Sequence, residues 1–168
     1  MNLRNLIPLG AALFLALPGL LLALESDSQQ PTYIEADRVE IDDAKGISIY
    51  RGNVILTQGT IHLASDILTV YNAEGETERY VADGEPARYK QTMDESQKEL
   101  VATALKIEYQ LARQIVTLTK DAHVTQNDDE FHGDRIVYNM RTTQVQASSA
   151  PNTGGRVRMV IQPRDTTP

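Results

Sequence analysis

Short runs in which apolar and polar residues alternate recur along most of the chain and predict an all-β protein. In one of them Val54 and Leu56 alternate with Ile55 and Thr57. A period of two places the two sets of side chains on opposite faces of a strand. Further apolar sets with this period are Ile61 and Leu63, Leu68 and Val70, Leu105, Ile107 and Tyr109, Val116 and Leu118, Ala122 and Val124, Ile136 and Tyr138, and Val157, Met159 and Ile161. We expect these sets to line one continuous interior.

Turn signals separate the runs at short intervals, as in proteins built from many short antiparallel strands. They are Asp43-Ala44-Lys45-Gly46, Arg51-Gly52-Asn53, Gln58-Gly59, Asn72-Ala73-Glu74-Gly75 and Asp83-Gly84-Glu85-Pro86. Segment 95–113 also contains good helix formers, such as Glu99, Leu100 and Ala102. Because residues 105–109 alternate and residues 110–114 read as a turn before the next apolar run, we interpret the segment as strand.

The first residues follow a different pattern. Arg4 precedes an uncharged run, residues 5–24, which is rich in Leu and Ala and typical of a secretory signal peptide. We expect cleavage after Ala23, which leaves residues 24–168 as a single domain with an ordered core over about residues 30–162. A run of this length can also anchor an uncleaved chain in a membrane. The interruption at Pro18-Gly19 and the small residue Ala23 favour cleavage.

Composition narrows the choice of compartment and partner. The sequence has 16 basic and 23 acidic residues, and its net charge of −7 disfavours a polyanion such as nucleic acid as a partner. It has no cysteine, so the folded state rests on packing rather than on disulfides. Together with the predicted signal peptide, these features indicate a protein of a bacterial periplasm.

Side chains suited to catalysis are sparse. The lack of cysteine excludes a thiol nucleophile and a thiolate metal site. His132-Gly133-Asp134 has the spacing that begins a two-histidine, one-carboxylate iron site, but such a site needs a further histidine on a later strand, and none follows. His62 and His123 fall on the outward parity of their strands, so we expect them at the surface. We therefore predict no catalytic residue, no metal site and no cofactor, in a protein that is not an enzyme.

Motifs in a fixed order cover the chain from about Gln30 to Gln162. They are Pro31-Thr32-Tyr33-Ile34-Glu35-Ala36-Asp37, Gly52-Asn53-Val54-Ile55-Leu56-Thr57-Gln58-Gly59, Ala64-Ser65-Asp66, Pro86-Ala87-Arg88-Tyr89 and Gly133-Asp134-Arg135-Ile136-Val137-Tyr138. In this order they resemble the OstA-like family of periplasmic lipopolysaccharide transport proteins, also called the LptA family. Lys120-Asp121-Ala122 departs from the pattern, because the family more often has a second Gly-Asn-Ala at that point.

The resemblance implies an open, twisted β-jelly roll of many short antiparallel strands, shaped like a folded V, with an apolar groove along its length. It also implies a periplasmic lipopolysaccharide-binding protein that shields the acyl chains of lipid A in the groove. Copies of such a protein form a head-to-tail bridge from the inner to the outer membrane. The implied partners are an LptC-like inner-membrane protein, an LptD-like outer-membrane receptor and further copies of the chain.

Two kinds of evidence select lipid-contacting residues. By family position, the resemblance assigns Thr32, Ile34, Tyr89 and Tyr109 to the groove. The alternation alone adds Leu56, Leu63, Leu105, Ile107, Val116, Leu118, Phe131, Ile136 and Tyr138. Each of these side chains also suits a plain hydrophobic core.

Three other functions fit parts of the pattern. A structural or adhesive periplasmic subunit that polymerises by strand addition explains unpaired strand edges but not an apolar groove. An LptC-like paralogue, anchored in the inner membrane, is the alternative if the N-terminal run is not cleaved. A jelly-roll enzyme such as a cupin needs a histidine cluster, which this chain, with three histidines, lacks.

Overall fold

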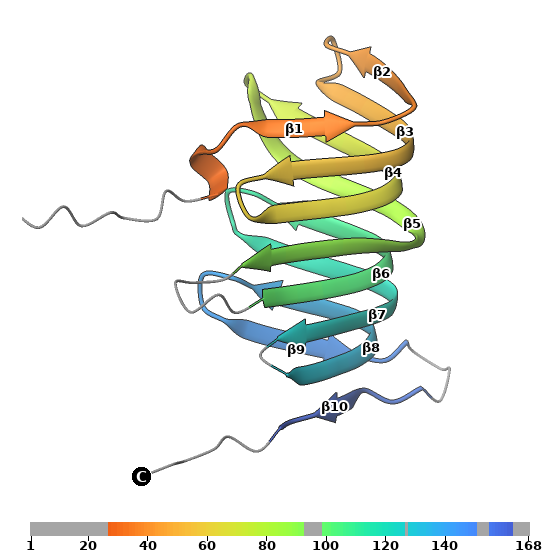
Figure 1. Cartoon of the computed structure of the whole chain (residues 1–168), viewed down its shortest axis with the longest axis vertical. Coiled ribbons are helices and arrows are strands. Elements are labelled where there is room, and N and C mark those ends of the chain that lie inside the picture. The colour runs from red at the N-terminus through yellow and green to blue at the C-terminus, as the bar shows by residue number, and fades with distance from the viewer. Residues whose placement is uncertain (1–26, 93–98, 127, 151–154, 163–168) are drawn as a thin grey trace, which may run out of the picture.

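The computed structural model describes residues 27–92, 99–126, 128–150 and 155–162, and the expected signal peptide and cleavage site lie outside these residues. A short 3₁₀ helix, η1 (Asp27–Gln29), precedes a single antiparallel sheet of ten strands. The strands are β1 (Thr32–Glu35), β2 (Arg38–Asp42), β3 (Ile47–Gln58), β4 (Ile61–Ala73), β5 (Glu76–Thr92), β6 (Glu99–Gln110), β7 (Ile115–Gln126), β8 (Asp129–Asn139), β9 (Gln144–Ser148) and β10 (Arg158–Val160). The prediction of an all-β fold is confirmed (Figure 1).

Strands that follow one another in the sequence are neighbours in the sheet from β3 to β8. The short strands complete the two edges: β1 and β2 both pair with β3, and β9 and β10 both pair with β8. Within segment 95–113 the described residues form β6 and a turn that ends where β7 begins at Ile115. The choice of strand over helix is therefore confirmed.

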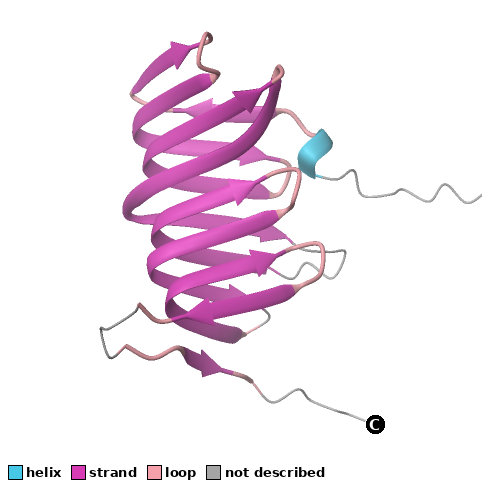
Figure 2. Cartoon of the chain, turned by 180° about the vertical axis from the view of Figure 1, so that it is seen from behind, coloured by secondary structure: helices cyan, strands magenta, loops and turns pink. Residues whose placement is uncertain are grey.

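Every long strand passes through a bend, marked by a shift in the register of its pairing. The bends form one row, since successive cross-strand partners along it are Arg51, Ile67, Asp83, Lys106, Thr119 and Arg135. This row folds the sheet into two half-sheets that face each other (Figures 1 and 2). The first half-sheet contains β1, β10 and the segments of β3 to β8 on the same side of the bends as β1 and β10. The second half-sheet contains β2, β9 and the segments of β3 to β8 on the other side of the bends.

Residues with a left-handed backbone form two of the bends. In β3 they are Gly52 (φ 79°) and Asn53 (φ 46°), and in β7 they are Lys120 (φ 64°) and Asp121 (φ 51°). Asp37 secures the bend of β3, because its N–H donates to the Gly52 carbonyl at 3.0 Å and its carboxylate accepts from Asn53 Nδ2 at 2.9 Å. The departure from the family motif at Lys120 thus keeps the backbone conformation of the first motif, although Lys120 carries a Cβ that disfavours it.

The space between the half-sheets is the hydrophobic core, as the alternation predicts. Side chains from both half-sheets meet there with almost no exposed surface. The largest of them are Tyr89, Tyr138, Leu56, Leu68, Leu100, Ile107, Leu118, Ile136, Val54, Val116 and Val124. Between them on each strand lie outward-facing residues, such as Ile55, which is exposed between the buried Val54 and Leu56.

The expectation of burial is wrong at two places. Leu105 was expected inside, but 37% of it is exposed, while Ala104 and Ile107 are buried. The bend of β6 inserts one extra residue between these two inward positions, so counting in twos across the bend fails. In the last apolar set, Val157, Met159 and Ile161 are exposed rather than buried.

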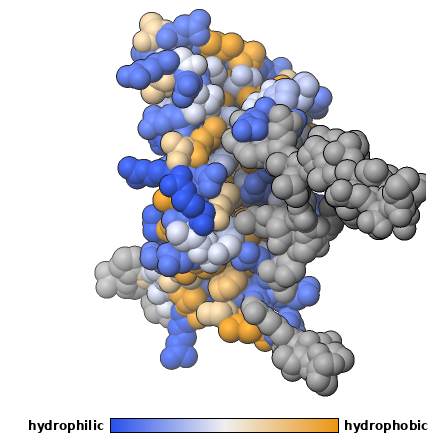
Figure 3. Space-filling model, turned by 90° about the vertical axis from the view of Figure 1, so that its left-hand side faces the viewer, coloured by the Kyte–Doolittle hydropathy of each residue, from blue (hydrophilic) through white to orange (hydrophobic). Residues whose placement is uncertain are grey.

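The interior faces solvent at both ends of the sheet. At the β2 edge, Val39 and Ile41 lie opposite the interior residues Tyr50 and Ser48, yet they are 49% and 61% exposed. At the β10 edge, Met159 lies opposite Phe131 and is 52% exposed. These side chains have the inward parity but no further strand covers them, and apolar side chains reach the surface near both ends in Figure 3.

Among the described residues there is no helix with the length and apolar character that crossing a membrane requires.

Candidate functional site

The interior between the half-sheets is the candidate functional site, because it brings together most of the predicted groove residues. One buried cluster contains Leu56, Leu63, Tyr89, Ile107, Tyr109, Val116, Leu118, Ile136 and Tyr138, with Ile34 and Phe131 packed against it. Thr32 lies opposite the buried Gln58 at the β1 edge but is itself exposed. Leu105 is not part of the interior.

Three tyrosines bridge the two half-sheets near the middle of the molecule. The ring of Tyr89, from the first half-sheet, meets Tyr109, from the second, edge to face at 6.1 Å between centroids. Tyr80 lies 6.4 Å from Tyr109 on the same half-sheet. Contacts between aromatic rings contribute an attraction in addition to the hydrophobic effect of burying the rings. Aromatic contacts thus join the halves at the level of β5 and β6.

The tyrosine hydroxyls lie in an environment that disfavours their ionisation. Burial raises the pKa of Tyr89 well above its ordinary value, and neighbouring tyrosines and the Asp27 carboxylate add to the effect. Burial also raises the pKa values of Tyr109 and Tyr138. Tyr89 donates a hydrogen bond to Gln91 Oε1 at 2.8 Å, and Tyr138 accepts one from Gln126 Nε2 at 3.0 Å. Polar side chains therefore satisfy hydroxyls at the margin of an otherwise apolar interior.

A carboxylate on η1 holds the start of the described chain against the β3–β4 turn and the end of β5. Asp27 Oδ1 accepts from the Thr60 N–H at 2.7 Å, and Asp27 Oδ2 accepts from the Thr60 hydroxyl at 2.8 Å and from Gln91 Nε2 at 2.7 Å. Figure 1 shows η1 on the side of the hairpin turns, opposite the row of bends. Through Gln91, this network reaches Tyr89 in the buried interior.

Sequence reasoning missed this network. The alternation identifies apolar faces, but it gives no signal for polar contacts between residues such as Asp27 and Thr60, which lie 33 positions apart. The only signal in the sequence is Gly59: a side chain there would collide with the Asp27 carboxylate, and its φ of 57° favours glycine.

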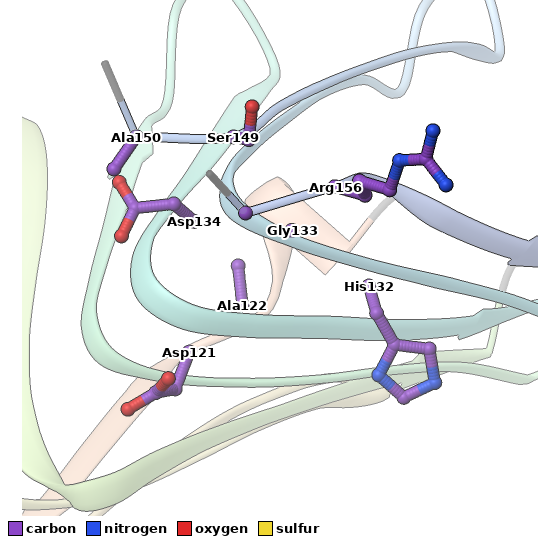
Figure 4. A pocket seen from close by; sticks show the side chains of 9 residues that line it. Asp121, Ala122, His132, Gly133, Asp134, Ser149, Ala150 and Arg156 are labelled. Carbon is purple, nitrogen blue, oxygen red and sulfur yellow. The ribbon is translucent and has the colours of Figure 1, made fainter. Parts of the chain in front are cut away.

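A pocket of about 460 Å³ lies at the bends of β7 and β8, where residues that follow β9 and residues that precede β10 also line it. Figure 4 shows the carboxylates of Asp121 and Asp134 and the guanidinium of Arg156 around it. Charged side chains share its lining with apolar residues such as Ala122 and Ala150, so we do not assign a ligand class to it. Within the described residues, the one group of side chains that could hold a metal ion is on the outer face and consists of His123, Glu130 and His132.

A single antiparallel sheet, folded on itself around an apolar interior that is exposed at both ends, defines the protein as an open β-jelly roll. A family model described as LptA/(LptD N-terminal domain) LPS transport protein matches residues 33–144. The chain belongs to this family, which confirms the resemblance seen in its motifs.

Known relatives agree with this assignment. The lipopolysaccharide export system protein LptH of Pseudomonas aeruginosa is 35% identical over 173 residues, which cover 98% of each chain. The lipopolysaccharide export system protein LptA of Escherichia coli K12 is 34% identical over 95% of this chain and 84% of its own length. The crystal structure of LptH, described as the LptA homologous periplasmic component of the conserved lipopolysaccharide transport device, superposes with a TM-score of 0.76. It is 33% identical over 83% of this chain and 100% of that chain.

Proposed function

We propose that this protein carries lipopolysaccharide across the periplasm by holding its acyl chains between the two half-sheets. The observation that carries the proposal is an apolar interior that extends from the β1–β2 edge to the β9–β10 edge in a member of a lipopolysaccharide transport family. Such a role needs no chemical step, and it agrees with relatives that are named as export system proteins.

The size of the hydrophobic effect explains why a carrier needs this interior. Each acyl CH₂ that leaves water contributes about 0.8 kcal/mol, so a twelve-carbon chain contributes on the order of 10 kcal/mol before ordering costs. A molecule with several such chains cannot leave a membrane for water at a useful rate. A protein that offers apolar contacts along its whole length replaces water at every stage of the passage.

The cargo has to displace contacts that the protein makes with itself. Residues such as Leu56, Leu118 and Ile136 have no exposed surface, so the half-sheets must part before an acyl chain can lie between them. The row of bends holds the half-sheets together on one side, and on the other side they meet through side chains. The Gln126–Tyr138 hydrogen bond is one of these contacts, because Gln126 belongs to the first half-sheet and Tyr138 to the second. We propose that the acyl chains enter on this side, where the hairpin turns join the strands.

The two ends suit head-to-tail contacts between copies. Each end offers the backbone of two short edge strands together with exposed apolar side chains that continue the interior face. Because the β1–β2 end and the β9–β10 end differ, their contact is heterologous and extends the groove from one copy to the next. LptC-like and LptD-like proteins of the same fold class would occupy the terminal positions of such a bridge.

The expected route to the periplasm completes the proposal. Cleavage after Ala23 would release residues 24–168 as one domain, so that the bridge is not tethered through its own N-terminus. A chain that keeps the apolar run would instead stay at the inner membrane. N-terminal sequencing of the protein from a periplasmic extract separates the two outcomes.

Site-specific photo-crosslinking in cells tests the cargo and the groove together. A photoreactive residue at Ile34, which packs against the interior cluster, should capture lipopolysaccharide. The matched control is Glu35, the next residue of β1, which is exposed and faces outward. Depletion of the outer-membrane receptor should increase the crosslink at Ile34 if the cargo accumulates along the bridge. Crosslinks that form from Glu35 and not from Ile34 would refute the groove assignment.

A further inference from the structure

Three side chains with metal-ligating atoms lie together on the outer face of the first half-sheet. His132 Nε2 lies 3.4 Å from Glu130 Oε2, and His123 Nε2 lies 4.0 Å from the same oxygen. The ligand atoms of the three residues are all within 4.8 Å of one another. Their side chains are 37–44% exposed, so water and ions reach them.

The pairing of β7 with β8 produces this cluster. His123 and His132 are directly opposite cross-strand partners, and their rings stack at 4.0 Å between centroids with an interplanar angle of 12°. Glu130 is two residues before His132 on β8 and therefore faces the same side. The residues between them, Val124 and Phe131, point into the interior. Three neighbouring residues on one face of two paired strands thus carry metal-ligating atoms.

These residues do not complete the motif considered from the sequence. That motif starts at His132 and needs Asp134 and a later histidine. In the structure the second histidine comes from the preceding strand, and the nearby carboxylate belongs to Glu130. His123 and His132 are nine positions apart and lie on different strands, so their proximity depends on strand register and a linear motif does not reveal it.

The donor set selects a class of metal ion. Two imidazoles and one carboxylate suit borderline ions such as Zn²⁺, whereas Mg²⁺ and Ca²⁺ prefer oxygen ligands alone. Two atoms that bind one tetrahedral Zn²⁺ at about 2.0–2.1 Å lie roughly 3.3 Å apart. The 3.4 Å separation of His132 Nε2 and Glu130 Oε2 already matches that distance.

One adjustment is required. The lone pair of an imidazole nitrogen lies in the plane of its ring, so two nearly parallel rings cannot both direct a lone pair at one ion. At least one ring must rotate about χ2, a motion that exposed side chains make at low cost. The rotation exchanges the stacking contact for a metal bond and leaves the backbone of both strands unchanged.

We propose that His123, Glu130 and His132 form a binding site for a borderline divalent transition-metal ion, of which Zn²⁺ is the representative, with water in the remaining position. The ion joins β7 to β8 directly beside the C-terminal edge of the sheet, because Arg158 of β10 is the cross-strand partner of His132. The site is on the opposite face of the strands from the groove, so it does not depend on the proposed lipid-carrying function.

Calorimetric titration of the untagged mature chain with Zn²⁺ tests the proposal. We expect one ion per chain, and a loss of affinity of at least about tenfold in each of the variants H123A and H132A. E130Q keeps both imidazoles and the shape of the side chain, and it should also weaken binding. The matched control is H62A, which removes the remaining histidine, located on the outer face of β4 next to Thr57.

Thermal denaturation gives a second readout that does not depend on heats of binding. An ion that binds the folded state alone raises the melting temperature. Zn²⁺ should raise it in the wild type and in H62A, and the rise should be lost in H132A. The proposal is overturned if Zn²⁺ does not bind at one ion per chain, or if H123A, E130Q and H132A all bind it as the wild type does.

Discussion

Asp27 accepts two hydrogen bonds from Thr60, one from the backbone N–H at 2.7 Å and one from the hydroxyl at 2.8 Å. The two residues are 33 positions apart, and their contact fastens η1 to the turn between β3 and β4. A third bond, from Gln91 Nε2, connects the same carboxylate to β5. One side chain therefore holds the start of the described chain against two hairpins.

Replacing Asp27 by Ala should lower the free energy of unfolding by about 1–2 kcal/mol, because three hydrogen bonds to one charged acceptor are lost. Urea denaturation measures the change. Asp43→Ala, which removes an exposed carboxylate from the turn between β2 and β3, is the control and should have little effect. A double variant with Thr60→Ala should cost less than the sum of the single changes. Strict additivity would show that the two side chains do not act as a pair.

Lys120→Gly should stabilise the protein, contrary to the usual effect of glycine in a strand. Lys120 has a φ of 64°, a conformation that costs a residue with a Cβ about 1–2 kcal/mol and that glycine adopts freely. We expect the free energy of unfolding to rise by about 1 kcal/mol, after the greater entropy of glycine in the unfolded chain is subtracted.

The converse change at the bend of β3 provides the control for Lys120→Gly. Gly52→Ala introduces a Cβ at a φ of 79° and directs it at the Asp37 carboxylate. It should destabilise the protein by at least about 1–2 kcal/mol. If both variants change stability in the same direction, backbone conformation does not control these bends.

Leu105→Ala and Ile107→Ala should differ clearly, although a simple count in twos puts both side chains inside. Ile107 is 1% exposed, and its truncation should cost about 2–5 kcal/mol through the cavity that it leaves. Leu105 is 37% exposed, and its truncation should cost less than about 1 kcal/mol. Chemical denaturation of both variants tests whether the alternation is displaced by one residue across the bend of β6. Equal losses would place Leu105 in the core after all.

The free energy of unfolding should fall as the pH rises above about 10, the ordinary pKa of tyrosine. The folded state raises the pKa of Tyr89, so in this range the unfolded chain loses the proton first and is stabilised relative to the folded one. Tyr109 and Tyr138 act in the same direction. Urea midpoints between pH 8 and pH 11 should show a shallower decline in Tyr89→Phe than in Tyr33→Phe, which alters an exposed ring on β1.

A charge on the exposed end of the interior should prevent copies from associating head to tail. Ile41→Asp places a carboxylate on the inward face of β2, where the proposed contact would bury it without a partner. Sedimentation velocity should show chains of the wild type that shorten to monomers in this variant. Ile55→Asp adds the same charge to an exposed outward position and should leave the chains intact. A wild type that stays monomeric at high concentration would refute the proposed contact.

The alternation of residues such as Val54, Ile55 and Leu56 was sufficient to predict the fold class, because period two determines which face of a strand meets the core. It failed at Leu105 because the inserted residue at the bend of β6 leaves no mark in composition or turn residues. It failed at Met159 for a different reason: the parity is correct, but burial requires a covering strand that the sheet edge lacks.

The apolar interior was largely predictable, and the polar features around it were not. Apolar side chains recur in alternation, so Ile107 and Ile136 could be assigned to the interior without knowing which strands pair. The contacts of Asp27 with Thr60 and of His123 with His132 depend on the register of particular strand pairs. The register of strand pairing cannot be derived from a single sequence.

The row of bends has a mechanical consequence for a cargo that moves along the molecule. Because β3 to β8 are each continuous through the bend, the wall on that side stays intact however wide the opposite side becomes. Widening can therefore be local, a few neighbouring hairpins at a time, with closed segments ahead of and behind the occupied one. A long amphiphile would then travel inside a local opening that moves along the molecule.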